Sequence, residues 1–478
     1  MTAIFDTIEN AIREHWKLIT AAIVVFLLWQ YNLLPGFIKF ALALGGTFLL
    51  GRIAWKLWVH YIRQDFISGI DYVLLEIVPP REVLRNPRAM ELFISNALYH
   101  WSYKGGKEEY WQGAVWFWFS LEIASIDGQV HFYIRTPTRI RGLIETQMYA
   151  QYPQAQVKEV PDYTLAVDKI SPESAWMGWG CEFALKKHEA YPIKTYVDFG
   201  LDKDPKEELK IDPLSPLIEL FASIKKGEQM WTQIVITPDK KEYKTKGIFG
   251  KGEGTNDWVK AAQDELAKLL GPYSSYKDVE EGPGGVSLKR SRIEVRVPDF
   301  LKRAVDGMSK KTSKLAFETG IRTMYIAKKE DWDLSSRRNI RLIYRQFDSP
   351  DVNGLIRINS SQADALNSSI LSLSPEQVMV LANRMLHEYR ERAFYHLPLR
   401  HHLFAIHTFE ELFPKPIIHP IAMMFIKPFF LPYVHHKTFM LNVEELATLW
   451  HFPGQILKVP TLERIESKEA SPPPNLPT

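Results

Sequence analysis

The sequence has little cysteine and no excess of one charge. Its single cysteine, Cys181, excludes a disulfide within the chain of 478 residues. The 59 Lys and Arg residues nearly balance the 56 Asp and Glu residues, which gives a net charge of +3 at pH 7. That charge is too small to indicate nucleic-acid binding by itself. Since 46% of the residues are hydrophobic and 24% are charged, the composition is that of a folded globular protein.

Sequence motifs for known catalytic chemistry are also missing. The nearest candidate for a phosphate-binding P-loop, Gly250-Lys251, lacks both the first glycine and the final Ser or Thr of that motif. His387-Glu388 begins like the zinc motif His-Glu-x-x-His, but the fifth position is Glu391. No Gly-x-Ser-x-Gly sequence occurs. We therefore predict that the protein is not an enzyme and that it has no catalytic residues, no cofactor and no metal site.

Two apolar stretches near the N-terminus stand out from the rest of the chain. Residues 17–34 and 37–59 flank Pro35-Gly36, a turn signal, and each approaches the length of about 20 residues that spans a bilayer. Basic residues collect on the side of the two chain ends: Arg13, Lys17, Arg52, Lys56 and Arg63. This distribution predicts a helical hairpin in the inner cell membrane with both termini in the cytoplasm. The alternative is a helical hairpin buried in the core of the protein.

Residues 65–170 have the pattern of a ferredoxin-like domain. Strands are predicted at 72–78, 115–123, 130–134 and 156–160, and helices at 86–101 and 138–152. Asp127-Gly128, between the second and third strands, is a hairpin signal. The resulting order, β-α-β-β-α-β, covers one face of a sheet with two helices.

Further segments complete the predicted organisation. Residues 1–64 carry the N-terminus and the membrane hairpin. Residues 171–290 form a second α+β domain, residues 291–440 form a mixed α/β C-terminal domain, and residues 441–478 hold a helix and a Pro-rich tail or linker. The predicted fold class is therefore α+β: a two-helix transmembrane hairpin followed by ferredoxin-like (βαββαβ) modules and a mixed helical C-terminal part.

A set of arginines is the best candidate for contact with nucleic acid. Arg338, Arg341 and Arg345 fall at helical spacing in a helix predicted over residues 335–346. A basic stripe of this kind is found against a phosphate backbone, against an acidic protein or simply in solvent. The sequence leaves these three interpretations open.

The C-terminal stretch resembles a known family. Residues 441–477 read LNVEELATLWHFPGQILKVPTLERIESKEASPPPNLP. This resembles the segment just before the motor domain of HerA/FtsK-like type IV secretion and conjugation ATPases. Residues 121–164 are similar to the N-terminal, non-motor region of the same group. The P-loop domain of that family has no counterpart up to Thr478, so we expect the motor to be supplied by another chain.

The resemblance implies a membrane-anchored, non-catalytic component of a type IV secretion-like or conjugation-like system. Its expected partners are the lipid membrane and a hexameric P-loop ATPase in trans, which the body recruits or orients. A homo-oligomer also fits, because the related domains sit on hexamers. The candidate partner-binding residues lie in the C-terminal stretch: Glu444, Glu445, Leu446, His451 and Pro453. The alternative function is a membrane-bound nucleic-acid-handling module that uses Arg338, Arg341 and Arg345.

Overall fold

The computed structural model describes part of the chain, and its residues form two compact units. The described residues are 34–80, 83, 85–99, 106–203, 212–239, 257–281, 288–295, 297–360, 375–396 and 437–454. The smaller unit includes helix α2 (Leu34–Ser68) up to Phe66 and the short helix α4 (Gly106–Trp111). The larger unit holds the β-sheet and the helices that pack on it.

Aromatic contacts and one ion pair join α2 to α4 within the smaller unit. The rings of Trp55 and Tyr110 lie 6.1 Å apart, and those of Trp58 and Trp111 lie 6.4 Å apart. An ion pair of 3.1 Å connects a guanidinium nitrogen of Arg63 to the Glu109 carboxylate. These contacts hold the last turns of α2 against α4.

The prediction of a transmembrane hairpin is wrong. Within the described residues, no helix is long and apolar enough to cross a membrane. The uncharged run of α2, from Phe40 to Gly51, is much shorter than the roughly 20 residues that a bilayer requires. Pro35-Gly36 lies in the first turn of α2, where a proline is tolerated, and does not separate two helices there. The first predicted stretch, 17–34, lies outside the described residues except for its last one. The predicted inner-membrane location is corrected on the same finding.

The larger unit is a mixed α/β structure built on one antiparallel sheet of nine strands. Its order is β10-β5-β9-β6-β2-β3-β1-β4, and β11 adds to β9. The strands are β1 (Tyr72–Val78), β2 (Phe119–Ile126), β3 (Gln129–Pro137), β4 (Gln156–Val160), β5 (Trp176–Leu185), β6 (Glu228–Pro238), β9 (Ala316–Lys328), β10 (Leu355–Ile358) and β11 (Phe439–Asn442). This single large sheet replaces the predicted series of separate modules behind a membrane hairpin.

The sheet consists of two halves with the same connectivity. In the first, the order along the chain is β1, α3 (Arg88–Phe93) with η1 (Ile94–Leu98), β2, β3, α5 (Arg141–Gln151) and β4. In the second, it is β5, α6 (Ser215–Ala222), β6, β9, α9 (Leu334–Asn339) and β10. The strand orders β2-β3-β1-β4 and β6-β9-β5-β10 correspond position by position. The two halves meet where β2 pairs with β6, from Phe119 opposite Ile236 to Ile126 opposite Gln229.

An insertion separates β6 from β9 in the second half. It contains α7 (Asp257–Leu270), the paired strands β7 (Ser274–Glu281) and β8 (Leu288–Val295), and α8 (Asp299–Thr312). The first half has only the two-residue turn Asp127-Gly128 at the equivalent place. The domain boundary that the sequence predicts at 290/291 falls inside β8.

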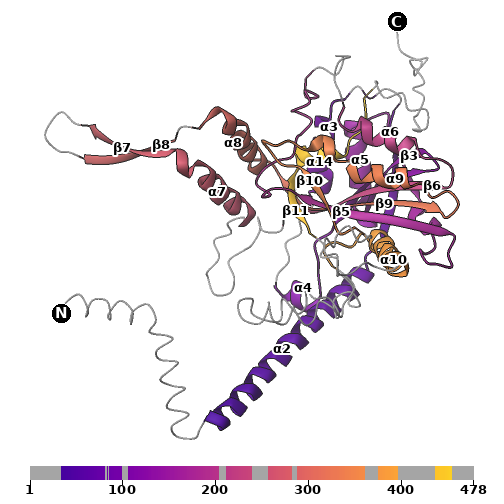
Figure 1. Ribbon diagram of the computed structural model, residues 1–478, viewed down its shortest axis with the longest axis horizontal. Coiled ribbons are helices and arrows are strands. Elements are labelled where there is room, and N and C mark those ends of the chain that lie inside the picture. Colours follow the sequence, from indigo (N-terminus) through magenta and orange to yellow (C-terminus); the bar gives the residue numbers. More distant parts are fainter. Residues whose placement is uncertain are drawn as a thin grey trace, which may run out of the picture. The chain divides into compact units, whose positions relative to one another are not determined.

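Helices cover both faces of the sheet in the larger unit. α3, α5, α6 and α14 (Val443–Leu449) lie on one face, and α10 (Pro375–Glu391) lies on the other (Figure 1). The main core lies between the sheet and the helices α3, α5, α6 and α14. It includes Phe93, Phe132, Phe221 and Trp450. A second cluster, with Trp231 and Tyr389 among its members, fills the space under α10. The alternation of side chains along each strand supplies both cores.

A row of polar side chains crosses the sheet on the face under α10. The register places Glu122 opposite Gln233, and Gln233 opposite Arg322. Arg322 is in turn opposite Glu182 and donates to it over 2.5 Å. Arg392, in the turn after α10, donates to Glu122 over 2.8 Å. Since all these side chains are fully buried, the charges are stable there only because each is paired.

Candidate functional site

The C-terminal motif, residues 439–454, is part of the sheet-bearing body. β11 pairs with β9, with Phe439 opposite Thr319 and Asn442 opposite Ala316. α14 then begins with a capping box: the Asn442 side chain accepts from the Glu445 amide, and the Glu445 carboxylate accepts from the Asn442 amide, each over 2.9 Å. The spacing Asn-x-x-Glu therefore determines locally where this helix starts.

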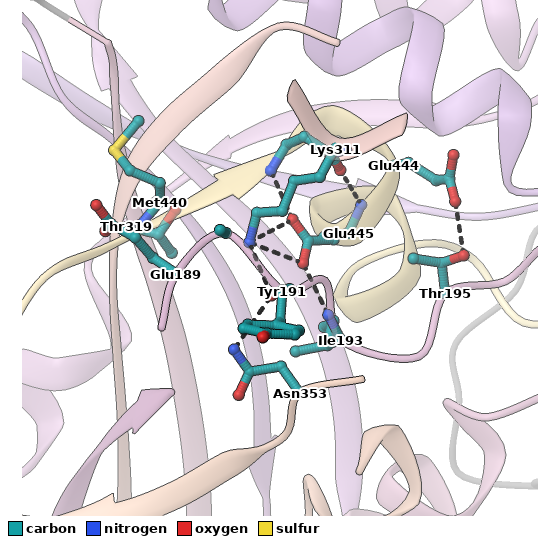
Figure 2. Close-up of polar contacts among 12 residues, drawn as sticks. Glu189, Tyr191, Ile193, Thr195, Lys311, Thr319, Asn353, Met440, Glu444 and Glu445 are labelled. Atoms are coloured by element: carbon teal, nitrogen blue, oxygen red, sulfur yellow. Dashed lines mark hydrogen bonds and ion pairs between the residues drawn. The ribbon is translucent and has the colours of Figure 1, made fainter. Parts of the chain in front are cut away.

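Glu445 is also the centre of a buried ion pair. The Lys311 ammonium lies 3.1 Å from one carboxylate oxygen of Glu445, and the Ile193 amide donates to the other oxygen over 2.9 Å (Figure 2). Both charged side chains are 0% exposed. Burial raises the pKa of Glu445, while Lys311 and the amide donors of Asn442 and Ile193 oppose that rise. This contact joins α8, α14 and the loop around residue 193 into one rigid cluster.

The loop over residues 187–193 is held by two further side chains. The buried amide of Asn353 donates to the carbonyl oxygen of His188 over 3.0 Å. It also donates to the carbonyl oxygen of Tyr191 over 3.1 Å (Figure 2). The Glu189 carboxylate accepts from the Met440 amide of β11 over 3.3 Å. The loop therefore lies in a fixed position between β11 and α8.

Glu444 occupies the rim of the same cluster. Its carboxylate accepts from the Thr195 hydroxyl over 2.6 Å and from the Lys314 ammonium over 2.7 Å. Lys314 also contacts Glu91, over 2.6 Å. Burial alone would lower the pKa of Lys314, but Glu444 and Glu91 raise it above its usual value. The side chain of Glu444 is 12% exposed, so it remains partly accessible.

A cavity of about 360 Å³ lies beside Glu444, between α8 and the loop that follows Pro192. Charged residues of both signs line it, namely Asp198, Asp299, Lys302, Arg303, Asp306 and Lys310. Arg303 bridges Asp198 and Asp351, at 2.9 and 2.7 Å. Lys302 and Lys310 are exposed at the surface of α8. Such a surface suits an electrostatic contact with another macromolecule better than the binding of an apolar small molecule.

The end of the motif is anchored in the core. The Trp450 indole N–H donates to the backbone carbonyl of Glu122 over 3.2 Å. His451 contacts the Asp212 carboxylate at 3.2 Å and the Ala447 carbonyl oxygen at 2.9 Å. Both residues are buried, as is Phe452. The backbone is therefore held as far as Pro453, close to the last described residue of the motif.

The structure brings the five predicted partner-binding residues together and buries four of them. Glu445, Leu446, His451 and Pro453 are inside the body, where they hold the C-terminal motif in place. Glu444 is the member of the five whose side chain a partner can reach without unfolding. Partner binding by these residues stays a prediction.

The predicted arginine stripe is divided among short elements. Arg338 lies at the surface of α9, Arg341 is half-buried in the 3-10 helix η6 (Ile340–Leu342), and Arg345 is exposed in η7 (Arg345–Phe347). Since the helix predicted over 335–346 is broken in this way, the three residues do not follow one helical face. Contact with nucleic acid stays a prediction.

Sequence reasoning missed the buried polar row of the sheet. Glu122 and Arg392 are separated by 270 positions, so no local spacing relates them. The available signal was a charged residue inside an apolar strand, such as Glu122, Glu182 or Arg322. Such residues are rarely buried without a partner. Among the described residues, no group of three or more His, Cys, Asp or Glu is placed to hold a metal ion.

Comparison with known proteins gives one match. The model of a family described as Domain of unknown function (DUF8128) matches residues 118–394. This chain belongs to that family. The matched region begins one residue before β2 and ends two residues after Arg392, so it contains both members of the Glu122–Arg392 pair. The C-terminal motif lies beyond it. No curated protein and no solved structure matches the chain.

Proposed function

We propose that this chain is a non-catalytic component of a type IV secretion-like or conjugation-like system. Its sheet-bearing body would orient a hexameric P-loop ATPase supplied by another chain. A membrane anchor is not part of this proposal. The observation that supports it is the rigid attachment of the C-terminal motif, which resembles the segment before the motor in HerA/FtsK-like ATPases.

Rigid attachment matters because orientation requires more than a tether. A flexible connection raises the effective concentration of a partner but leaves its direction free. Here Lys311, Trp450 and His451 hold the motif through buried contacts. The described part of the motif therefore ends, at Gly454, at a defined point of the body. A partner that docks beside this point would be held in one direction.

The surface beside the motif supplies the predicted contact. It consists of Glu444 and the exposed lysines of α8, Lys302 and Lys310, around the cavity beside Glu444. Charged groups at the rim of an interface mainly increase the association rate and the selectivity for a complementary partner. We therefore expect a complex that weakens as salt is added.

The test is binding of the purified full chain to the HerA/FtsK-like P-loop ATPase of the same cell. We expect a stable complex at low salt that Lys302→Glu with Lys310→Glu weakens about tenfold. The matched control reverses two exposed lysines next to β6, Lys225→Glu with Lys226→Glu, and should bind like the unaltered chain. Failure to recover an ATPase at low salt would contradict the proposal.

The same preparation tests the alternative of a nucleic-acid-handling module. Arg338 and Arg345 are exposed, so a DNA backbone can reach them. Salt-dependent DNA binding that is lost when Arg338, Arg341 and Arg345 are replaced by Ala would favour this alternative. DNA binding that persists in the triple variant would argue against it.

A further inference from the structure

Within the described residues, three side chains at one corner of the sheet have buried polar groups that lack hydrogen-bond partners, and a half-buried arginine lies beside them. They lie on the face under α10, near the start of β1 and β2 and the end of β3. We call them the donor cluster, and its members are Tyr72, Trp118, Ser120 and Arg135.

The members of the donor cluster lie side by side. Ser120 is directly opposite Arg135 in the pairing of β2 with β3, so both side chains are on the same face of the sheet. The Arg135 guanidinium carbon lies 3.9 Å from the centre of the Tyr72 ring. The Tyr72 and Trp118 rings are 5.4 Å apart. Each side chain is therefore close to another member of the cluster.

Three of the four members have hydrogen-bonding groups that no described residue uses. The Tyr72 hydroxyl, the Trp118 indole N–H and the Ser120 hydroxyl are buried and have no hydrogen-bond partner within the described part of the chain. Buried polar groups of this kind cost roughly 1–3 kcal/mol each when they are left unsatisfied. Three such groups at one place indicate that something else completes their hydrogen bonds.

Arg135 adds a positive charge beside these donors. Within the described residues, its guanidinium makes a cation–π contact with Tyr72 but no hydrogen bond or ion pair. The two carboxylates that attract it electrostatically, Glu122 and Asp162, are already engaged by Arg392, which donates to both. Burial, reinforced by the positive charge of Arg392, lowers the pKa of Arg135 to about 10. A bound anion would offset the free-energy cost of burying this positive charge.

The donors define the chemistry of the ligand. Arginine and the tryptophan N–H can only donate, so the ligand must accept, and the guanidinium requires a negative charge. A guanidinium fork pairs with a carboxylate or with a phosphate. The five guanidinium N–H groups together with three other donors exceed the two oxygens of a carboxylate, whereas a phosphate offers more acceptor oxygens in more directions. We propose that the donor cluster is a binding site for a phosphate group.

The proposal is tested by titrating inorganic phosphate into the full chain. The heat of binding is measured by calorimetry, and the melting temperature of the protein is measured with and without phosphate. Phosphate should raise the melting temperature of the unaltered protein, because a ligand that binds the folded state stabilises it. Arg135→Gln should weaken phosphate binding by about tenfold or more. Trp118→Phe keeps a ring but removes the donor, and should weaken binding about fivefold.

The controls separate this site from general charge effects. Lys226→Gln removes an exposed positive charge just before β6 and should leave phosphate binding unchanged. Arg135→Gln removes an unpaired charge, so without phosphate it should be at least as stable as the unaltered protein. Chloride at matched ionic strength should not reproduce the effect of phosphate.

Two further probes distinguish the source of the phosphate group. A nucleoside 5′-monophosphate that binds at least as tightly as inorganic phosphate would identify a small phosphomonoester. A short oligonucleotide that binds more tightly, and loses that binding in Arg135→Gln, would identify a phosphodiester backbone.

The absence of any heat of binding and of any change in melting temperature at millimolar phosphate would overturn the proposal. Phosphate binding that is equal in Arg135→Gln and the unaltered protein would overturn it too.

Discussion

Glu445 combines two roles that are usually carried by separate residues. Its carboxylate completes the capping box of α14 and neutralises Lys311 in the core. A carboxylate at the third helical position is common in capping boxes, but a buried ammonium beside it is not required by the motif. The ion pair therefore adds a tertiary constraint to a local one.

Replacing Glu445 should show how strongly the motif is held. Glu445→Gln leaves the Lys311 ammonium buried without a counter-charge, so the free energy of unfolding should fall by about 3–5 kcal/mol. Glu444→Gln, at the partly exposed rim, should cost about 1 kcal/mol or less. Urea unfolding of the two variants measures both values. Equal losses of unfolding free energy in the two variants would show that the buried ion pair contributes no more to stability than the contact at the rim.

His451 should make stability depend on pH. Burial alone would lower the pKa of His451, but Asp212 and the Ala447 carbonyl raise it above its ordinary value. Protonated His451 therefore stabilises the folded state. This contribution is complete below the unfolded pKa of about 6.5 and is lost as the pH rises through the higher folded pKa.

The measurement is the free energy of unfolding in urea at a series of pH values. In the unaltered protein it should decrease as the pH rises above about 6.5. The decrease should become smaller in His451→Gln, which cannot take up the proton, and in Asp212→Asn, which removes its partner. An unchanged decrease in His451→Gln would assign the effect to another group.

At the scale of elements, the turn between β2 and β3 depends on its glycine. Asp127 and Gly128 both have positive φ, at 54° and 84°, as a two-residue hairpin turn requires. A Cβ at Gly128 would lie 2.8 Å from the Ile224 carbonyl oxygen. The hairpin therefore depends on the backbone freedom of Gly128 and on the space beside it.

A pair of glycine substitutions tests this account. Gly128→Ala should lower the free energy of unfolding by more than about 1 kcal/mol, through strain and the close contact. Gly142→Ala lies in α5 with nothing within 4 Å of its new Cβ, and should raise stability by roughly 0.5–1 kcal/mol. Thermal unfolding of the two variants shows whether each substitution lowers or raises the stability of the protein. A stabilising Gly128→Ala would contradict the account.

At the scale of the whole molecule, the two halves of the sheet depend on each other. The β2–β6 pairing runs along the full length of β2, and one continuous core includes residues from both halves. Arg392, which follows α10, pairs with Glu122 in the first half. Neither half can unfold without exposing apolar surface and buried charge of the other.

We therefore expect β2 and β6 to open together. Hydrogen–deuterium exchange of their backbone amides should give the same free energy of opening for both strands. That value should equal the free energy of global unfolding of the larger unit. The smaller unit, with α2, provides an internal comparison, because its amides can have a lower free energy of opening. Faster exchange in one half of the sheet would show that the halves unfold separately.

Local signals in the sequence predicted several elements correctly. Asp127-Gly128 marked its hairpin, residues 441–478 contain a helix as predicted, and the strands and helices predicted over residues 72–160 occur in the predicted order. The predicted transmembrane hairpin was wrong, because hydrophobic content over a window does not show how far the uncharged part of a helix extends.

By itself, then, the sequence determined the turns, the helix starts and the alternation of apolar side chains, because these depend on neighbours a few positions away. Only the tertiary structure decided that β2 pairs with β6, that Glu445 meets Lys311, and that the donor cluster gathers at one corner of the sheet. The physical reason is distance along the chain. Glu445 and Lys311 are 134 positions apart, and no residue spacing encodes such a contact until the sheet and its insertion bring the two together.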